Sequence, residues 1–74
     1  MVSFKVLYLD GSPAKGIKIT IDIPGKELVS ETDHLGIVSF DIPMQRGRIS
    51  INDLPLYYGM LEVDAFQIPT LKKN

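Results

Sequence analysis

The stretch Glu31-Thr32-Asp33-His34-Leu35-Gly36-Ile37-Val38-Ser39-Phe40 decides the fold, because a polar turn in it passes directly into an alternating strand. Asp33 suits the first turn position, since its carboxylate can accept a hydrogen bond from the backbone N–H two residues on. Gly36 suits the last position, since glycine takes a positive φ without steric cost. From Val38 to Ile42, apolar and polar residues then alternate as in a strand with one buried face. The stretch therefore predicts a hairpin that fixes the register of a small β-sandwich.

The rest of the chain consists of short apolar runs separated by prolines and glycines, and none reaches helical length with a helical period. The clearest run alternates four isoleucines with polar residues, which indicates one buried face and one solvent-exposed face. The isoleucines are Ile17, Ile19, Ile21 and Ile23, and the opposite face holds Lys18, Thr20 and Asp22. Expected strands cover residues 2–9, 17–23, 27–31, 37–42 and 48–52. Residues 56–68 form one bent strand or two, with a bulge expected near Gly59.

Length, composition and charge limit the classes of protein to which this chain can belong. The chain has 74 residues, 45% of them hydrophobic, which suits one domain over residues 1–74 near the small end of what folds unaided. Its net charge of −1 is spread without blocks apart from Lys72-Lys73, so nucleic-acid binding is not expected. No apolar run approaches the ~18 residues of a membrane helix, so we expect no membrane insertion. The compartment is expected to be cytoplasmic if Met1 is the native start, and extracellular if the chain is an excised domain of a surface protein.

Few residues could ligate a metal. The chain has no cysteine and His34 is its single histidine, so a site of imidazole and thiolate ligands is not available. Calcium takes oxygen ligands, which Asp10, Asp33, Asp41 or Asp53 could supply, but no D-x-D-x-D-G loop is present. We therefore expect solvated turn acids, an exposed turn histidine, and neither a metal nor a cofactor.

Two motifs resemble known families. Residues 10–21 match the pattern D-G-x-P-x-x-G-V-x-V-x-V with isoleucine at the valine positions, and Thr32-Asp33-His34-Leu35-Gly36 followed by Phe40 matches T-D-x-x-G-x-x-x-F. Together they resemble the prealbumin-like and carboxypeptidase regulatory-like β-sandwiches and the bacterial immunoglobulin-like repeats related to them. The resemblance implies an all-β, seven-stranded antiparallel Greek-key β-sandwich, often a structural or ligand-presenting module. These motifs are turn and core positions, so they bear on fold rather than on function.

One prealbumin-like family, the hydroxyisourate hydrolases, is enzymatic and resembles this chain at Val6-Leu7 and at residues 11–16. Those enzymes carry a histidine where this chain has Lys5, and a C-terminal Tyr-Arg-Gly-Ser motif that Tyr57-Tyr58-Gly59 matches poorly. Hydrolysis needs a general base and an oxyanion donor placed together, and one turn histidine cannot supply both. We therefore expect no enzyme and no catalytic residue. The alternative is a small prealbumin-type hydrolase or ligand-binding domain with a site at a subunit interface.

The candidate partner surface lies within residues 56–61 and consists of Leu56, Tyr57, Tyr58, Met60 and Leu61. Two adjacent tyrosines on a strand point to opposite faces, so at most one is buried with its neighbours. The segment holds more large apolar groups than one strand face can bury, and a sandwich also leaves edge strands that must be covered or paired. We therefore expect a non-catalytic structural or protein-interaction module. It would bind a protein partner, or a second copy of itself, through a strand edge or through this surface.

Overall fold

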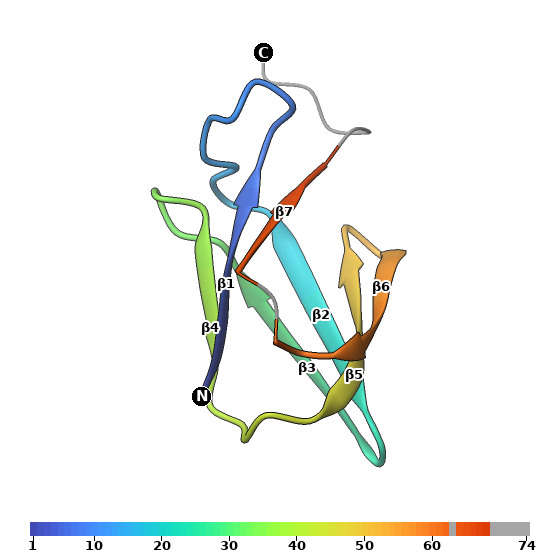
Figure 1. Cartoon of the computed structure of the whole chain (residues 1–74). Helices are drawn as coiled ribbons and strands as arrows, with labels where there is room; N and C mark the ends of the chain where they lie inside the picture. Colours follow the sequence, from blue (N-terminus) through green and yellow to red (C-terminus); the bar gives the residue numbers. More distant parts are fainter. Residues whose placement is uncertain (63, 69–74) are drawn as a thin grey trace.

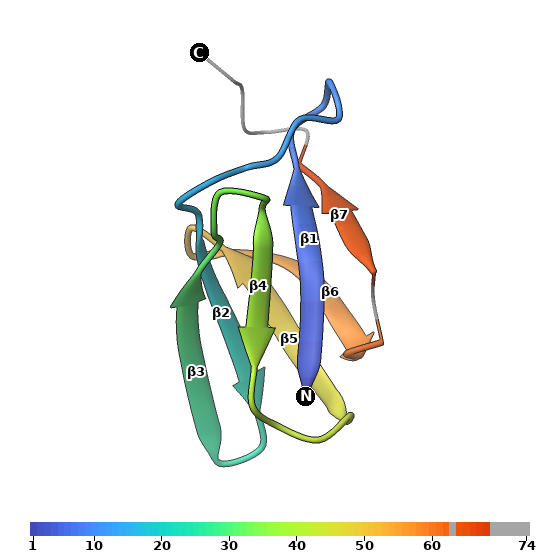
Figure 2. The ribbon, with the colours of Figure 1, turned by 90° about the vertical axis from the view of Figure 1, so that its left-hand side faces the viewer.

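The computed structural model describes residues 1–62 and 64–68, which form seven strands and no helix, arranged as two facing sheets (Figure 1, Figure 2). The strands are β1 (Val2–Leu7), β2 (Lys18–Ile23), β3 (Lys26–Glu31), β4 (Ile37–Phe40), β5 (Arg46–Ile51), β6 (Leu54–Met60) and β7 (Ala65–Gln67). One sheet has the order β4-β1-β7 and the other the order β3-β2-β5-β6. This two-layer, all-β arrangement is that of a β-sandwich. No helix that could cross a membrane occurs in the described part of the chain.

The strand directions differ at one pair from the wholly antiparallel arrangement that we expected. Every neighbouring pair in the four-stranded sheet is antiparallel, and so is the pair of β1 and β4. β1 and β7, however, run parallel, with Lys5 opposite Ala65. Nearly the whole chain separates these two strands, so no hairpin turn forces them into opposite directions. The three-stranded sheet is therefore mixed.

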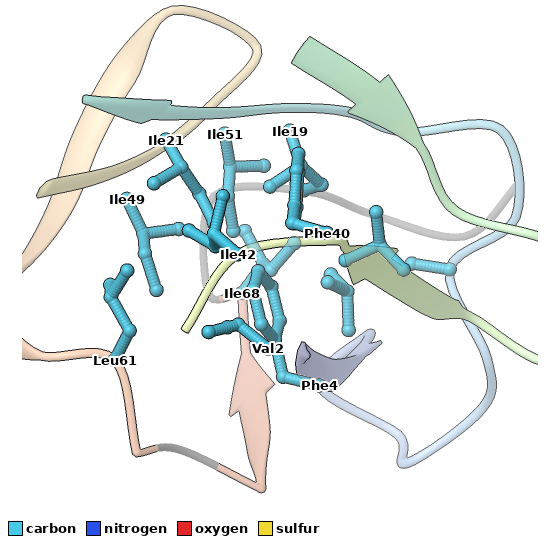
Figure 3. Close-up of a cluster of buried hydrophobic side chains, with 13 residues drawn as sticks. Val2, Phe4, Ile19, Ile21, Phe40, Ile42, Ile49, Ile51, Leu61 and Ile68 are labelled. Atoms are coloured by element: carbon cyan, nitrogen blue, oxygen red, sulfur yellow. The ribbon is translucent and has the colours of Figure 1, made fainter. Parts of the chain in front are cut away.

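The core lies between the two sheets and is built from the inward-facing side chains of both (Figure 3). Ile19 and Ile21 of β2 are fully buried, as their alternation predicted, while Ile17 and Ile23 at the strand ends are half-buried. The other buried apolar residues are Val2, Phe4, Val6, Ala14, Val38, Phe40, Ile42, Ile49, Ile51, Leu61 and Ile68. The core thus draws on both layers, through strands β1, β2, β4 and β5 and four residues that lie outside the strands.

We expected Thr20 to lie on a solvent-exposed face of the second strand, but Thr20 is only 7% exposed. Thr20 lies on the outer face of β2, an interior strand, and its direct neighbours are Val29 of β3 and Ser50 of β5. Side chains on the outer face of an interior strand are covered laterally by both neighbouring strands. Period-two alternation identifies the face on which a residue lies, but it does not show whether the strand is interior.

The segment that was expected to form one bent strand or two forms two, β6 and β7, which lie in different sheets. β6 begins at Leu54, before Pro55, because Asn52 and Asp53 have positive φ values of 49° and 69° and form a two-residue hairpin turn after β5. This turn was not predicted.

The bulge in β6 is also displaced from the position that we expected near Gly59. Ile49 lies opposite Tyr57 and Ser50 lies opposite Pro55, so Leu56 is the additional residue. Predictions for Val63 and for the terminal pair Lys72-Lys73 lie outside the described residues.

Candidate functional site

The turn between β3 and β4 is held by the side chain of Asp33. The prediction of a hairpin here was wrong, because β3 and β4 lie in different sheets and the turn connects the two layers. One carboxylate oxygen of Asp33 accepts hydrogen bonds from the backbone N–H groups of Leu35 and Ile37, each at 2.9 Å. These bonds, that from Ile37 above all, lower the pKa of Asp33 from its ordinary value. Gly36 has the predicted positive φ, +77°, and its carbonyl accepts a hydrogen bond from the N–H of Val6 at 2.8 Å. The turn therefore docks against β1.

Thr32, just before this turn, connects the turn to the segment between β1 and β2. Its side chain is buried, its hydroxyl accepts a hydrogen bond from the Ile17 N–H at 2.9 Å, and the same hydroxyl donates to the Ala14 carbonyl. Every backbone group involved is thereby satisfied inside the fold. Thr32, Asp33 and Gly36 thus have structural roles here.

The residues considered as metal ligands or catalytic groups are dispersed. His34 is exposed on the turn, as predicted. Asp10 accepts hydrogen bonds from the N–H and hydroxyl of Ser12, and Asp53 forms an ion pair with Lys18 at 3.0 Å. Among residues 1–62 and 64–68, no three side chains with metal-ligating groups lie together.

The candidate partner surface is divided by the structure. Tyr58 is 72% exposed, and Leu56 and Met60 are exposed as well. Leu61 is only 1% exposed and belongs to the core, so its assignment to a surface was wrong. Leu54, which the prediction omitted, is 56% exposed on the same strand, although it lies opposite the buried Ile51 and so on the other face of the strand from Tyr58. We call Leu54, Leu56, Tyr58 and Met60 the β6 edge surface.

Tyr57 faces inward, opposite to Tyr58, as the strand geometry predicted. Its ring is half-buried and makes an edge-to-face contact with Phe66 of β7, with 5.7 Å between the ring centroids. Its hydroxyl donates a hydrogen bond to the Met60 carbonyl at 2.6 Å. Tyr57 therefore packs β6 against the other sheet, and Tyr58 alone of the two tyrosines is available to a partner.

The backbone of β6 is open on one side. Within the described part of the chain β6 pairs only with β5, so it forms one edge of its sheet (Figure 1). The N–H of Leu61 donates a hydrogen bond to the Gln45 carbonyl on the β5 side. In an antiparallel pair, successive residues of one strand direct their N–H and C=O groups alternately toward the partner strand and away from it. Tyr58 and Met60 consequently direct their N–H and C=O groups away from β5. The Met60 carbonyl accepts from Tyr57, which leaves Tyr58 with both groups open.

Two arginines border the β6 edge surface on β5. Arg46 lies directly opposite Met60 and Arg48 directly opposite Tyr58, and both arginines are exposed. Together with Tyr58, and with Asp22 directly opposite Arg48 on β2, they line an open depression of about 270 Å³ on the outer face of the sheet. Sequence reasoning missed this arrangement because the register between β5 and β6 depends on the unpredicted turn at Asn52 and Asp53.

The arrangement offers exposed apolar area, two cations and open backbone groups, a combination typical of protein-binding surfaces, where tyrosine, methionine and arginine are enriched. A scan against protein-family models found no match for this chain, and searches of curated proteins and of solved structures found none either. Function is therefore inferred from the residues and their arrangement alone.

Proposed function

We propose that this chain is a non-catalytic protein-interaction module that associates through the β6 edge surface. The observation that carries the proposal is the concentration of exposed apolar groups. Four of the nine large hydrophobic residues exposed in the described part of the chain lie on β6, which has seven residues. No residue of β6 is charged, although edge strands in monomeric proteins are commonly protected by charge. Pro55 and the bulge at Leu56 protect only the first part of the strand, so the binding segment is its second part, around Tyr58.

We further propose that the scaffold is a Greek-key sandwich of the prealbumin-like or carboxypeptidase regulatory-like kind. The strand order supports this proposal, because the chain passes from one sheet to the other after β1, β3, β4 and β6: β4 lies beside β1, and β5 returns beside β2. The roles of Thr32, Asp33 and Gly36 in the turn support it as well. No observation favours the hydrolase alternative as a second function, since His34 is exposed on its turn and lines neither of the two depressions on the outer sheet face.

Sedimentation velocity over a concentration series tests the proposed function, with thermal melting as the folding control. We expect the wild-type chain to associate, and we expect Tyr58→Ser to raise the dissociation constant roughly tenfold, because truncating an interface tyrosine costs more than ~1 kcal/mol of binding. The melting temperature of Tyr58→Ser should stay unchanged. Tyr57→Ser should instead lower the melting temperature, because it removes the contact with Phe66 and the hydrogen bond to Met60.

Leu35→Ser is the matched control, since Leu35 is an exposed apolar residue on a turn far from β6 in the sequence. It should leave the association as it is in the wild type. A wild-type chain that remains monomeric at every concentration would refute association through β6, and so would an equal effect of Leu35→Ser and Tyr58→Ser.

A further inference from the structure

We propose that the occupant of the β6 edge is strand β3 of a second copy of this chain, so that copies join head to tail and extend the four-stranded sheet. This inference rests on the proposed function, because it takes β6 as the associating strand. The observation behind it is that the two edges of this sheet carry complementary charge. Glu27 and Glu31 lie on the outer face of β3 at one edge, with Lys26 at the start of the same strand, and Arg46 and Arg48 lie on β5, next to β6, at the other.

Strand direction favours this pairing. The four strands β3, β2, β5 and β6 alternate in direction, so the two edge strands run opposite to each other (Figure 2). A second copy displaced sideways, without being turned over, therefore places its β3 antiparallel to β6. The outer faces of the two copies then lie on the same side, and the alternation of strand directions continues across the junction.

The backbone of β3 has open groups at matching positions. The N–H of Thr32 donates to the Ile17 carbonyl, and alternation from this pair along β3 directs the groups of Ser30 and Leu28 toward β2. Val29 and Glu27 consequently direct their N–H and C=O groups toward the open edge. Within residues 1–62 and 64–68, β2 is the only strand that pairs with β3. The N–H and C=O groups of Val29 and Glu27 on β3 can thus form hydrogen bonds with those of β6, where the groups of Tyr58 are open.

The side chains at these positions lie on the same outer face and complement one another. On β3, Val29 is 55% exposed and lies between Glu27 and Glu31, which are also exposed. Placing Val29 of the second copy opposite Tyr58 sets two apolar groups side by side. The antiparallel register then places Glu27 of the second copy opposite Met60, in the same row as Arg46.

None of these four side chains forms an ion pair within the described part of the chain, although Arg48 lies directly opposite Asp22 and Glu31 directly opposite Lys18 on β2. In the described residues the one ion pair joins Lys18 and Asp53, and it involves neither the glutamates of β3 nor the arginines of β5. The long side chains of arginine and glutamate can reach each other over the intervening strand while keeping their charged ends in water. A symmetric pairing of β6 with β6 of a second copy would instead bring two pairs of arginines to the same junction and leave the acidic edge without a partner.

Reciprocal charge reversal tests the proposal. The first variant, Arg46→Glu with Arg48→Glu, makes both edges acidic, and the second, Glu27→Arg with Glu31→Arg, makes both edges basic. Each variant alone should raise the apparent dissociation constant by at least about tenfold, because like charges then face each other at every junction. Mixed in equal amounts, the two variants should associate again, since each edge then finds an opposite edge. Lys5→Glu with Lys15→Glu is the matched control for the first variant, because it makes the same change in net charge and neither lysine lies on β3, β5 or β6.

The mass distribution in sedimentation velocity separates the outcomes. We expect the wild-type mass to grow past the dimer as concentration rises, because a head-to-tail contact does not close on itself unless a ring forms. We also expect association to weaken as salt increases. A wild-type dimer that Glu27→Arg with Glu31→Arg leaves intact would overturn the head-to-tail inference and leave the proposed function standing. Failure of the mixture to associate would overturn the inference as well, and a monomeric wild type would overturn both proposals.

Discussion

Replacing Gly36 with alanine tests how the turn docks against β1. At φ +77° an L-residue costs about 1–2 kcal/mol relative to its ordinary conformation. In addition, an added Cβ would lie 2.6 Å from the Val6 carbonyl oxygen and 3.2 Å from the Ala14 nitrogen. Both are backbone atoms, so the backbone must move, at a cost of about 1–3 kcal/mol. We therefore expect Gly36→Ala to lower the free energy of unfolding by ~2–5 kcal/mol, which is most of the stability of a domain this small.

Gly25→Ala is the matched control, since Gly25 has a similar φ of +79° but an added Cβ there meets no atom within 4 Å. It should cost only about 1–2 kcal/mol. His34→Ala, in the same turn as Gly36, should leave stability unchanged because the histidine is exposed. Urea denaturation of the three variants measures the differences. Equal losses from Gly36→Ala and Gly25→Ala would refute the argument that close approach to β1, and not φ alone, requires glycine.

Two further predictions concern the core and the turn acid. Ile19→Ala should cost ~2–5 kcal/mol because Ile19 is fully buried, whereas Val29→Ala on the exposed face should cost less than ~1 kcal/mol, and equal urea midpoints would contradict the assigned faces. The pKa of Asp33 is lowered by the hydrogen bonds it accepts, so its contribution to stability is complete above the pKa of the unfolded chain and is lost as pH falls through the lower pKa of the folded state. Thermal melts from pH 6 to pH 2 should show a smaller acid-induced loss for Asp33→Asn than for the wild type, and an NMR titration of Asp33 at an unshifted pKa would contradict the prediction.

The features that could be predicted from the sequence are those that depend on residues close together in the chain. Asp33 and Gly36 each have a role that depends on the few residues around them, and the structure confirms both. The buried faces of β2 and β4 likewise follow from alternation within a single strand. Thr20 shows the limit of this reasoning, because its burial depends on β3 and β5 lying on either side of it.

The candidate site could be predicted only in part because it depends on pairing between strands. Alternation of faces, which is a local property, predicted that at most one of Tyr57 and Tyr58 is buried, but it did not show that Tyr58 is the exposed one. Leu61 was misplaced because the chain leaves β6 at Met60 and turns into the core, and no residue pattern marks that point. The contribution of Arg46 and Arg48 depends on the hairpin at residues 52–53, whose positive φ values occur without a glycine.

The parallel pairing of β1 with β7 has a consequence for the order in which the protein can fold during synthesis. β1 is synthesised before the other six strands, yet it becomes the central strand of its sheet, with Lys5 beside Ala65. Until β7 has been synthesised, one edge of β1 has no strand to pair with, and its apolar face is only partly covered. Contacts between residues so far apart in sequence make folding slow, on the order of milliseconds to seconds for comparable β topologies. The nascent chain thus passes through a period in which an apolar strand with an open edge is exposed to other chains, and this is the stage at which a chaperone would act.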